Sequence, residues 1–169
     1  DKSEKRLKLM KQNLDRLNYH LDLICIDIFD YKPTKLFDIV LLDPPCTASG
    51  TIGKNPDLQF LNPLEKLAQL SELQQKMLDR CASWLKADGF IIYSVCSLLK
   101  EEGEDQISRF LQKNENFCVV HPEKRGYLHQ EGYEVQEKSG IRIMPFFEEG
   151  IGGTEGFFIA YLRLKGKSN

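Results

Sequence analysis

The amino-acid sequence predicts an α/β fold with a mostly parallel sheet covered by helices on both faces. Two short apolar runs, 39–42 and 90–95, continue without alternation, which is typical of strands buried on both faces. Between these runs, apolar residues recur with helical spacing over residues 64–85. Strands that alternate with helices favour a parallel sheet built from crossover units.

The composition is ordinary for a single globular domain. The 169 residues are 41% hydrophobic and 28% charged, which is enough to enclose a core. No run of 18 apolar residues is present, and the first residues lack the pattern of a secretory signal. Because the net charge is −2, RNA binding would need a local patch or another part of the protein.

The five cysteines are expected to be reduced thiols of a cytoplasmic protein. Their number is odd and no two form a CxxC pair. The three histidines show no metal-ligand spacing to the cysteines, so no metal site is expected. A cysteine in an apolar segment is usually a small buried hydrophobe, and this is our expectation for Cys25, Cys81 and Cys118.

The first third of the chain is expected to hold a helix, two strands and a long loop. Apolar residues at helical spacing predict an amphipathic helix within residues 2–18. The apolar run 21–26 predicts a strand that ends at Asp27. The strand at 37–42 must end at Pro44-Pro45, because proline cannot donate a ladder hydrogen bond. Residues 47–62 predict an irregular loop of a length that is uncommon unless functional.

The rest of the chain continues with helices and strands. Pro63 suits the start of the long helix, and Asp88-Gly89 suits its stop and a turn. Acidic residues 101–105 favour the start of another helix after Cys96. Further strands are predicted at 117–120, 141–144 and 157–164, the last two joined by a glycine-rich turn, whereas 121–140 shows no clear period.

Chemically active side chains stand at the ends of two predicted strands. Asp43 and Cys46 follow the strand at 37–42, and Cys96 ends the strand at 90–95. Neighbouring strands lie about 5 Å apart, and ligands of open α/β sheets bind outside the carboxyl ends of strands. The two thiols and the carboxylate are therefore expected to face one crevice. Residue type alone leaves a buried structural role open for both cysteines.

Several motifs in order resemble the Sun/Fmu family of RNA cytosine-5 methyltransferases, in particular its small-subunit ribosomal RNA branch. They are Asp43-Pro44-Pro45-Cys46, Pro56-Asp57, and Tyr93-Ser94-Val95-Cys96-Ser97 followed by Glu101-Glu102. The likeness extends from Asp1 to the closing strand at 156–160. It implies a Rossmann-like S-adenosylmethionine-dependent methyltransferase sheet that is incomplete, because the family's first strand and glycine-rich donor loop have no counterpart here.

The resemblance therefore implies that residues 1–169 are the C-terminal portion of a single methyltransferase catalytic domain. Such a piece is expected to be inactive alone and to bind the methyl donor poorly. Two open sheet edges would favour self-association. The expected partner of the parent enzyme is RNA, in particular small-subunit (16S) ribosomal RNA, with no membrane contact.

The resemblance also implies residue roles. Cytosine C5 becomes nucleophilic when a thiolate adds to C6. In the family the nucleophile is the cysteine of the later motif, here Cys96, and Cys46 is associated with release of the methylated base. Asp43 is expected to bond either the cytosine or the donor. The expected contacts of S-adenosylmethionine are Asp1 at the ribose, Asp27 near the adenine, and Asp43 with Pro44.

Alternatives remain open at this point. An exocyclic-amine methyltransferase would carry an aromatic residue where Cys46 stands, and a non-catalytic RNA-binding module would explain the absent donor loop. Asp27 could instead be a turn residue, and Asp1 could be a frayed terminus. Gly103 replaces an asparagine that is usual in the family, and we expect it to loosen the following helix, since glycine costs about 1 kcal/mol there.

Overall fold

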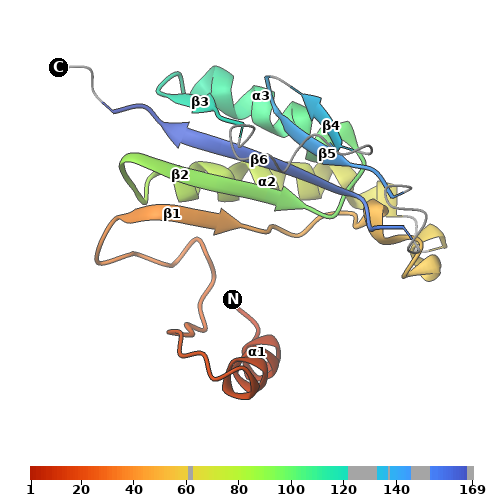
Figure 1. Ribbon diagram of the computed structural model, residues 1–169, viewed down its shortest axis with the longest axis horizontal. Helices are drawn as coiled ribbons and strands as arrows, with labels where there is room; N and C mark the ends of the chain where they lie inside the picture. The colour runs from red at the N-terminus through yellow and green to blue at the C-terminus, as the bar shows by residue number, and fades with distance from the viewer. Residues whose placement is uncertain (61–62, 122–132, 137, 146–152, 167–169) are drawn as a thin grey trace. The chain divides into compact units, whose positions relative to one another are not determined.

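The computed structural model describes residues 1–60, 63–121, 133–136, 138–145 and 153–166. It divides the chain into two compact units, residues 1–34 and 35–169 (Figure 1). No helix in these ranges is long and apolar enough to cross a membrane.

The first unit contains the predicted amphipathic helix. Helix α1 spans Glu4–Arg16, and Ser3 caps it by accepting a hydrogen bond from the Arg6 backbone N–H through Oγ. No side chain of α1 is buried. The remainder of the unit, up to residue 34, is irregular.

The predicted strand at 21–26 is wrong. A strand needs a neighbouring ladder, and in the described part of the chain this segment shares backbone hydrogen bonds only with Asp1. The Asp1 amino group donates to Ile24 O at 3.2 Å, and Ile26 N–H donates to Asp1 O at 3.2 Å. Two bonds to one residue hold the segment beside Asp1 without forming a strand.

The second unit is built on one sheet, whose path runs β1-β2-β6-β5-β4, with β3 also pairing β6. The predicted strands after residue 35 are all present, and β4 lies in the stretch for which none was predicted. Their bounds are β1 Phe37–Leu42, β2 Leu85–Val95, β3 Phe117–Val119, β4 Tyr133–Gln136, β5 Gly140–Ile143 and β6 Phe157–Leu164. The predicted turn at Asp88-Gly89 lies within β2, where Asp88 has φ 62°. Residues 146–152 of the expected glycine-rich turn lie outside the described ranges.

The expectation of a mostly parallel sheet is wrong for the described strands. Only β1 and β2 pair in parallel, and the four other pairings are antiparallel. Parallel neighbours need a long crossover, which α2 (Leu67–Ala82) provides between β1 and β2. After α3 (Glu104–Lys113), strands β4, β5 and β6 follow one another as antiparallel neighbours.

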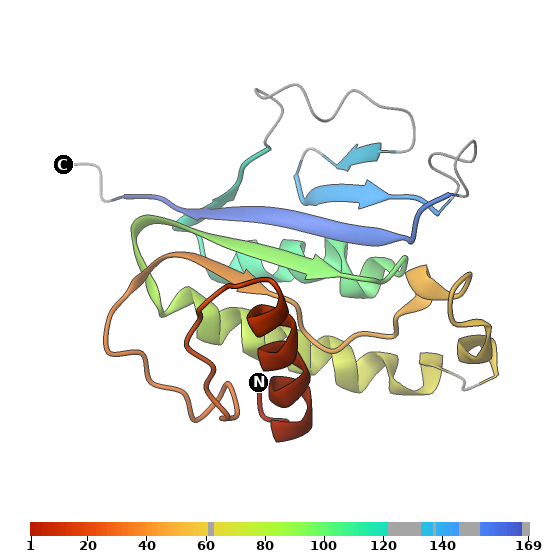
Figure 2. The ribbon, with the colours of Figure 1, turned by 60° about the horizontal axis from the view of Figure 1, so that its bottom comes forward.

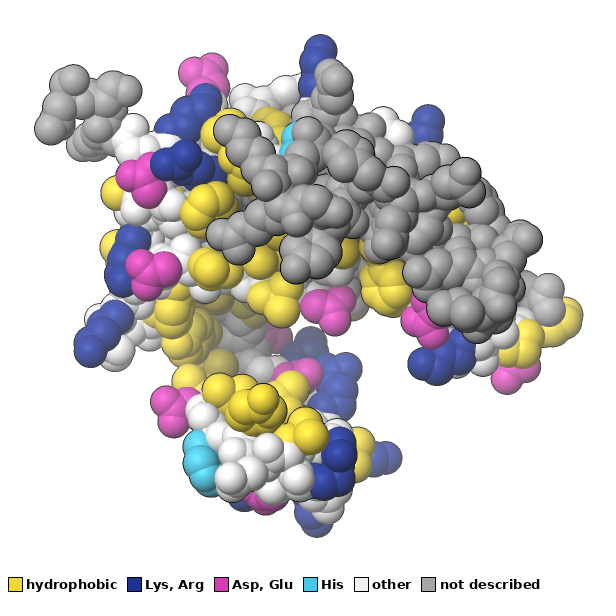
Figure 3. All heavy atoms as spheres, viewed as in Figure 1, with side chains coloured by type: hydrophobic (Ala, Val, Ile, Leu, Met, Phe, Trp, Pro, Cys, Tyr) yellow, Lys and Arg dark blue, Asp and Glu magenta, His cyan; other side chains and the backbone are white. Residues whose placement is uncertain are grey.

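The core of the second unit lies between the sheet and the helices α2 and α3, which pack on one face (Figure 2). Alternate residues of the two central strands are buried against these helices, namely Ile91, Tyr93 and Val95 of β2 and Phe158, Ala160 and Leu162 of β6. By contrast, Ile39 and Leu41 of β1 are not covered by these helices and are 58% and 69% exposed. Burial of β1 on both faces is therefore wrong, and Figure 3 shows apolar side chains at the surface over this face.

Short 3-10 turns occupy the connections near the strand ends. They are η1 Ser49–Thr51, η2 Pro56–Gln59, η3 Pro63–Lys66 and η4 Lys100–Glu102. The loosening expected from Gly103 is wrong, because Gly103 is the N-cap of α3 and not an interior residue. A Cβ at Gly103 would lie 3.0 Å from the Phe158 ring and 2.9 Å from Arg142 Nη2. Close packing of α3 on the sheet accounts for the glycine.

Candidate active site

The two thiols singled out by the sequence lie in contact. The predicted adjacency of their strands is confirmed, since β1 and β2 pair in register from Ile39↔Phe90 to Leu42↔Tyr93. Both strands end at the same edge of the sheet. Beyond these ends, Cys46 Sγ and Cys96 Sγ are 3.4 Å apart, a hydrogen bond in which either sulfur could be the donor.

The two sulfurs differ in proton affinity. The hydrogen bond from Cys46 lowers the pKa of Cys96 to about 7, although partial burial and the nearby Asp43 charge act in the opposite direction. The pKa of Cys46 is raised, first because its proton is held in the bond to Cys96 and second because the side chain is partly buried. The favoured arrangement is a Cys96 thiolate that accepts a hydrogen bond from a Cys46 thiol.

Asp43 is the third member of the predicted site. Its side chain is exposed, yet the surrounding protein atoms desolvate it enough to raise its pKa. No hydrogen bond or ion pair to its carboxylate is recorded among the described residues. Asp43 therefore keeps both oxygens available to a bound molecule. Pro44, which follows it, is buried.

A buried polar cluster supports the segment that carries Cys46. Glu102, with no exposed surface, accepts hydrogen bonds from Thr47 N–H at 3.0 Å and from Gln74 Nε2 at 2.9 Å. Gln74 Nε2 also donates to Pro45 O at 2.9 Å. These bonds hold the backbone on both sides of Cys46.

Hydroxyl groups join the segment after Cys46 to the segment after Cys96. Ser49 Oγ and Ser97 Oγ are 3.1 Å apart, and Ser49 Oγ also accepts the Leu98 N–H at 3.0 Å. Gly50 N–H donates directly to Cys96 O at 3.1 Å. The two thiols are thereby set on backbone segments that are bonded to each other.

An ion pair supports the Cys96 segment from the other side. Arg142 of β5 is 6% exposed and pairs with Glu104 of α3, with Nε donating to Oε1 at 3.0 Å. Its Nη1 donates to Ser97 O at 3.2 Å, and its guanidinium lies 5.4 Å from the centre of the Phe158 ring. Arg142 thus links the sheet, α3 and the residue that follows Cys96.

The two remaining predicted donor-site residues lie in the first unit. Asp1 Oδ1 accepts hydrogen bonds from Ser3 N–H at 2.8 Å and Arg6 Nη2 at 2.9 Å. Asp27 accepts the Phe29 N–H at 3.1 Å and pairs with Lys2 at 3.6 Å, so it does form the local turn bond that the alternative interpretation predicted. Because the two units are not placed relative to each other, the structure does not bring Asp1 or Asp27 together with Asp43.

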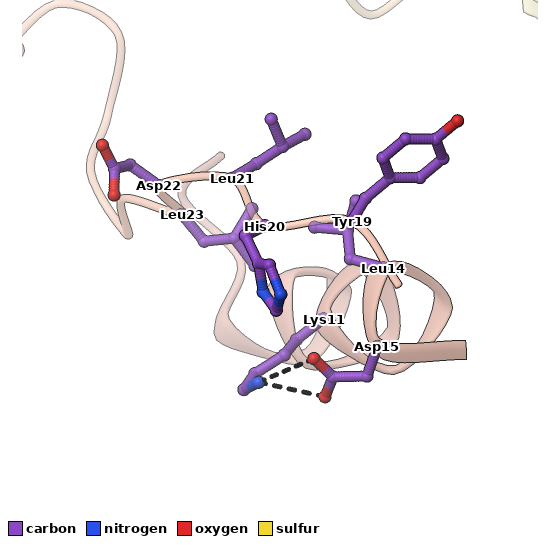
Figure 4. Close-up of a pocket in the computed structure, with 8 residues that line it drawn as sticks. All are labelled: Lys11, Leu14, Asp15, Tyr19, His20, Leu21, Asp22 and Leu23. Atoms are coloured by element: carbon purple, nitrogen blue, oxygen red, sulfur yellow. Dashed lines mark hydrogen bonds and ion pairs between the residues drawn. The ribbon is translucent and has the colours of Figure 1, made fainter. Parts of the chain in front are cut away.

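An open hollow of about 500 Å³ also lies in the first unit (Figure 4). Within it Lys11 Nζ bonds both oxygens of Asp15, at 3.1 and 3.0 Å. Its lining is Lys11, Leu14, Asp15, Tyr19, His20, Leu21, Asp22 and Leu23. It includes none of the predicted donor contacts. Among the described residues, no group of three histidine, cysteine, aspartate or glutamate side chains could hold a metal ion.

Comparison with known proteins decides the family. Residues 1–163 match the model of the family described as 16S rRNA methyltransferase RsmB/F. The chain belongs to this family. The sequence-based resemblance is therefore confirmed.

Curated relatives of the family carry the name ribosomal RNA small subunit methyltransferase B. That of Shewanella oneidensis is 40% identical over 116 residues, which cover 67% of this chain and 27% of the relative. That of Photorhabdus laumondii is 34% identical over 165 residues, 96% of this chain and 35% of the relative. The chain thus spans about a third or less of the length of these relatives.

Solved structures confirm the Rossmann-like methyltransferase fold. The structure described as PH0851 has a TM-score of 0.82 and 31% identity, over 96% of this chain and 35% of that one. The structure described as NSun6 from Pyrococcus horikoshii with SFG has a TM-score of 0.77 and 27% identity, over 97% of this chain and 40% of that one.

Within this family site, sequence reasoning missed the residues that support the thiols. The sequence marks Glu102 only as an acidic residue of a motif and of a helix start, and it does not single out Gln74. Gln74 interrupts no apolar stripe, so periodicity gave no signal. The one available signal was that Glu101 and Glu102 follow each other within the motif. The sequence could not tell which of the two is buried.

Proposed function

We propose that this chain carries the catalytic thiols of an S-adenosylmethionine-dependent methyltransferase that modifies C5 of cytosine in RNA. The observation that carries the proposal is the contact of Cys46 with Cys96 at 3.4 Å, in which the pKa of Cys96 is lowered to about 7. Family membership and the names of the relatives support small-subunit ribosomal RNA as the substrate. Residues 1–169 are proposed to be the C-terminal portion of one catalytic domain.

Cys96 is proposed to be the nucleophile. Its thiolate adds to C6 of the cytosine, which makes C5 enamine-like and able to take a methyl group. A free cysteine is only a few per cent ionised at neutral pH. The hydrogen bond from Cys46 raises this fraction before RNA arrives.

Cys46 is proposed to assist release of the methylated base. In release, C5 loses its proton to solvent, its bonding electrons form the C5–C6 double bond, and the bond between Cys96 Sγ and C6 breaks with its electron pair returning to Cys96 as negative charge. The Cys46 thiol is placed to donate a hydrogen bond to that sulfur as the charge returns. Hydrogen bonds to an ionised acceptor are roughly twice as strong as neutral ones.

The remaining roles concern the base and the donor. S-adenosylmethionine, when bound, supplies the methyl group. Asp1 is proposed to bind its ribose, Asp27 to lie near its adenine, and Asp43 with Pro44 to contact the donor or the cytosine. The residues fit such a ligand, because Asp43 and Oδ2 of Asp1 have no recorded hydrogen-bond partner among the described residues.

The test uses the complete natural protein and RNA that contains 5-fluorocytosine, which cannot lose a C5 proton. We expect a covalent protein–RNA adduct in the wild type, no adduct and no methylation in Cys96→Ala, and wild-type behaviour in the control Cys118→Ala. With unmodified RNA, Cys46→Ala should accumulate the Cys96 adduct. Full methylation by Cys96→Ala would overturn the proposal, and methylation without adduct would favour an exocyclic amine.

A further inference from the structure

Glu102 is a buried acid held by neutral donors. Its side chain has no exposed surface, and no ion pair to it is recorded among the described residues. Thr47 N–H donates to both carboxylate oxygens, at 3.0 and 3.2 Å, and Gln74 Nε2 donates to Oε1 at 2.9 Å. Thr47 Oγ1 donates to Oε2 as well. A buried carboxylate without an ion-pair partner is costly unless several hydrogen bonds compensate it, so its burial at this place calls for a role.

The bonds of Glu102 converge on the two peptide groups that flank Cys46. The Thr47 N–H belongs to the peptide group that follows Cys46. The peptide group before it presents Pro45 O, which accepts from the same Gln74 Nε2 that donates to Glu102. Glu102 and Gln74 therefore bind the backbone on both sides of Cys46, and we call these hydrogen bonds the Glu102–Gln74 clamp. Neither side chain touches a sulfur through a recorded hydrogen bond.

The Glu102–Gln74 clamp is itself hydrogen-bonded to buried residues of the core. Tyr93 OH of β2 donates to the backbone carbonyl of Glu102 at 2.8 Å, and Gln106 Nε2 of α3 donates to Gln74 Oε1 at 3.0 Å. Gln74, Tyr93 and Gln106 have no exposed surface. The segment that carries Cys46 is thus fixed to α2, α3 and β2, whereas Cys96 directly follows β2.

We propose that Glu102, together with Gln74, is a positioning residue that holds the Cys46 thiol against the Cys96 sulfur with its proton directed toward Cys96. This inference deepens the proposed function and rests on it. Glu102 acts on Cys96 only through Cys46, so its removal weakens the hydrogen bond that Cys96 receives, which impairs release of the product and also reduces ionisation of Cys96.

The electrostatics of the site act in the same direction. The pKa of Cys46 is raised by the hydrogen bond to Cys96, then by burial, and also by the charge of Glu102. Glu102 therefore favours the protonated form of the residue that must donate. Besides each other, the charged groups that act on the two thiols are Glu102 on Cys46 and Asp43 and Glu155 on Cys96, and the titratable Tyr93 hydroxyl feels the charge of Cys46.

The test compares Glu102→Gln with Glu101→Gln in the complete natural protein. The control removes the same charge from the neighbouring exposed residue. For Glu102→Gln we expect kcat to fall about tenfold, which corresponds to the loss of one hydrogen bond to a charged group. KM for RNA and for the donor should change little, and the Cys96–RNA adduct should accumulate as in Cys46→Ala.

A second readout does not depend on turnover. Alkylation of Cys46 and Cys96 by iodoacetamide is followed by mass spectrometry across pH, in the protein without RNA. In the wild type Cys96 should react first, and the midpoint of its pH profile should lie at about pH 7. In Glu102→Gln the ratio of Cys46 to Cys96 modification should rise about tenfold, and Glu101→Gln should leave it unchanged.

Gln74→Met keeps Glu102 but removes the hydrogen bonds from Gln74 to Pro45 O and to Glu102. This variant tests the same clamp if Glu102→Gln fails to fold. Both variants should shift the alkylation ratio in the same direction. Wild-type kcat and an unchanged alkylation order in both folded variants would overturn the positioning role alone. Full methylation by Cys96→Ala would instead overturn the proposed function, and this inference with it.

Discussion

Cys46 and Cys96 are the same residue type, yet their surroundings give them opposite proton affinities. The pKa of Cys96 is lowered to about 7 while the pKa of Cys46 is raised. The largest cause in both cases is their mutual hydrogen bond. The asymmetry arises because Cys46 is the more enclosed of the two and lies nearer to Glu102. The causes named for the lowered pKa of Cys96 include a thiol hydrogen bond and no basic side chain.

Cys46→Ala should raise the pKa of Cys96 toward its ordinary value of 9.0, because the hydrogen bond that stabilises the thiolate is lost. Alkylation of Cys96 at pH 7 should slow by up to about fiftyfold, and the midpoint of its pH profile should move upward. The measurement is site-resolved alkylation, with buried Cys81 as an unreactive internal reference. A midpoint that stays near 7 would show that Cys46 does not stabilise the thiolate.

Gly50→Ala should destabilise the protein by about 1–3 kcal/mol, the usual cost of overpacking. A Cβ at Gly50 would lie 2.0 Å from the backbone oxygen of Gly156, and the Gly156 N–H donates a hydrogen bond to Gly50 O at 2.8 Å. Gly53→Ala is the matched control, since nothing lies within 4 Å of its Cβ position. Urea unfolding should separate the two, and equal midpoints would contradict the packing argument.

At this scale the sequence located the reactive groups but not their supports. Asp43, Cys46 and Cys96 stand out because they follow apolar runs at strand ends. Glu102 and Gln74 lie at polar positions of helical segments, where a polar residue is the common case. Their burial depends on how α2 and η4 pack behind the Cys46 segment, which no local pattern encodes.

Among the elements, the sequence predicted those with a strong period and missed those defined by their neighbours. Apolar spacing located α1, α2, β1 and β2 because each places a stripe or a run of apolar residues in one place. Residues 21–26 have an equally apolar run but no neighbouring ladder. The parallel direction was predicted correctly for β1 and β2 but wrongly for the other strands, since direction depends on the length of the connections and not on the strands themselves.

Arg142→Met should destabilise the protein by about 3–5 kcal/mol, because it leaves the largely enclosed Glu104 carboxylate without its partner. The pair joins β5 to α3, with side chains only 7% and 16% exposed. The control is Arg163→Met, whose pair with Asp88 is 46% and 58% exposed and should be worth no more than about 1 kcal/mol. Unfolding midpoints in urea provide the comparison, and similar losses in both variants would contradict the expected difference.

For the whole molecule, composition and net charge indicated only a globular domain, and the ordered motifs identified the family. A charge of −2 carries no information about an RNA partner. The motifs succeed because they place two thiols and a carboxylate in a fixed order after two strands, and the family model matches residues 1–163.

The exposed side of β1 should make this chain associate with itself at high concentration. In the described residues β1 pairs only with β2, and its Ile39 and Leu41 are 58% and 69% exposed. An apolar strand with an unpaired edge is a template for another chain, and a lysine on it opposes pairing. Leu41→Lys should therefore weaken association in sedimentation velocity, with little change in stability since the side chain is already exposed.

Met10→Lys, at a 46% exposed position of α1, is the control for added charge. If the chain stays monomeric at all concentrations, or if both variants act equally, β1 is not the contact.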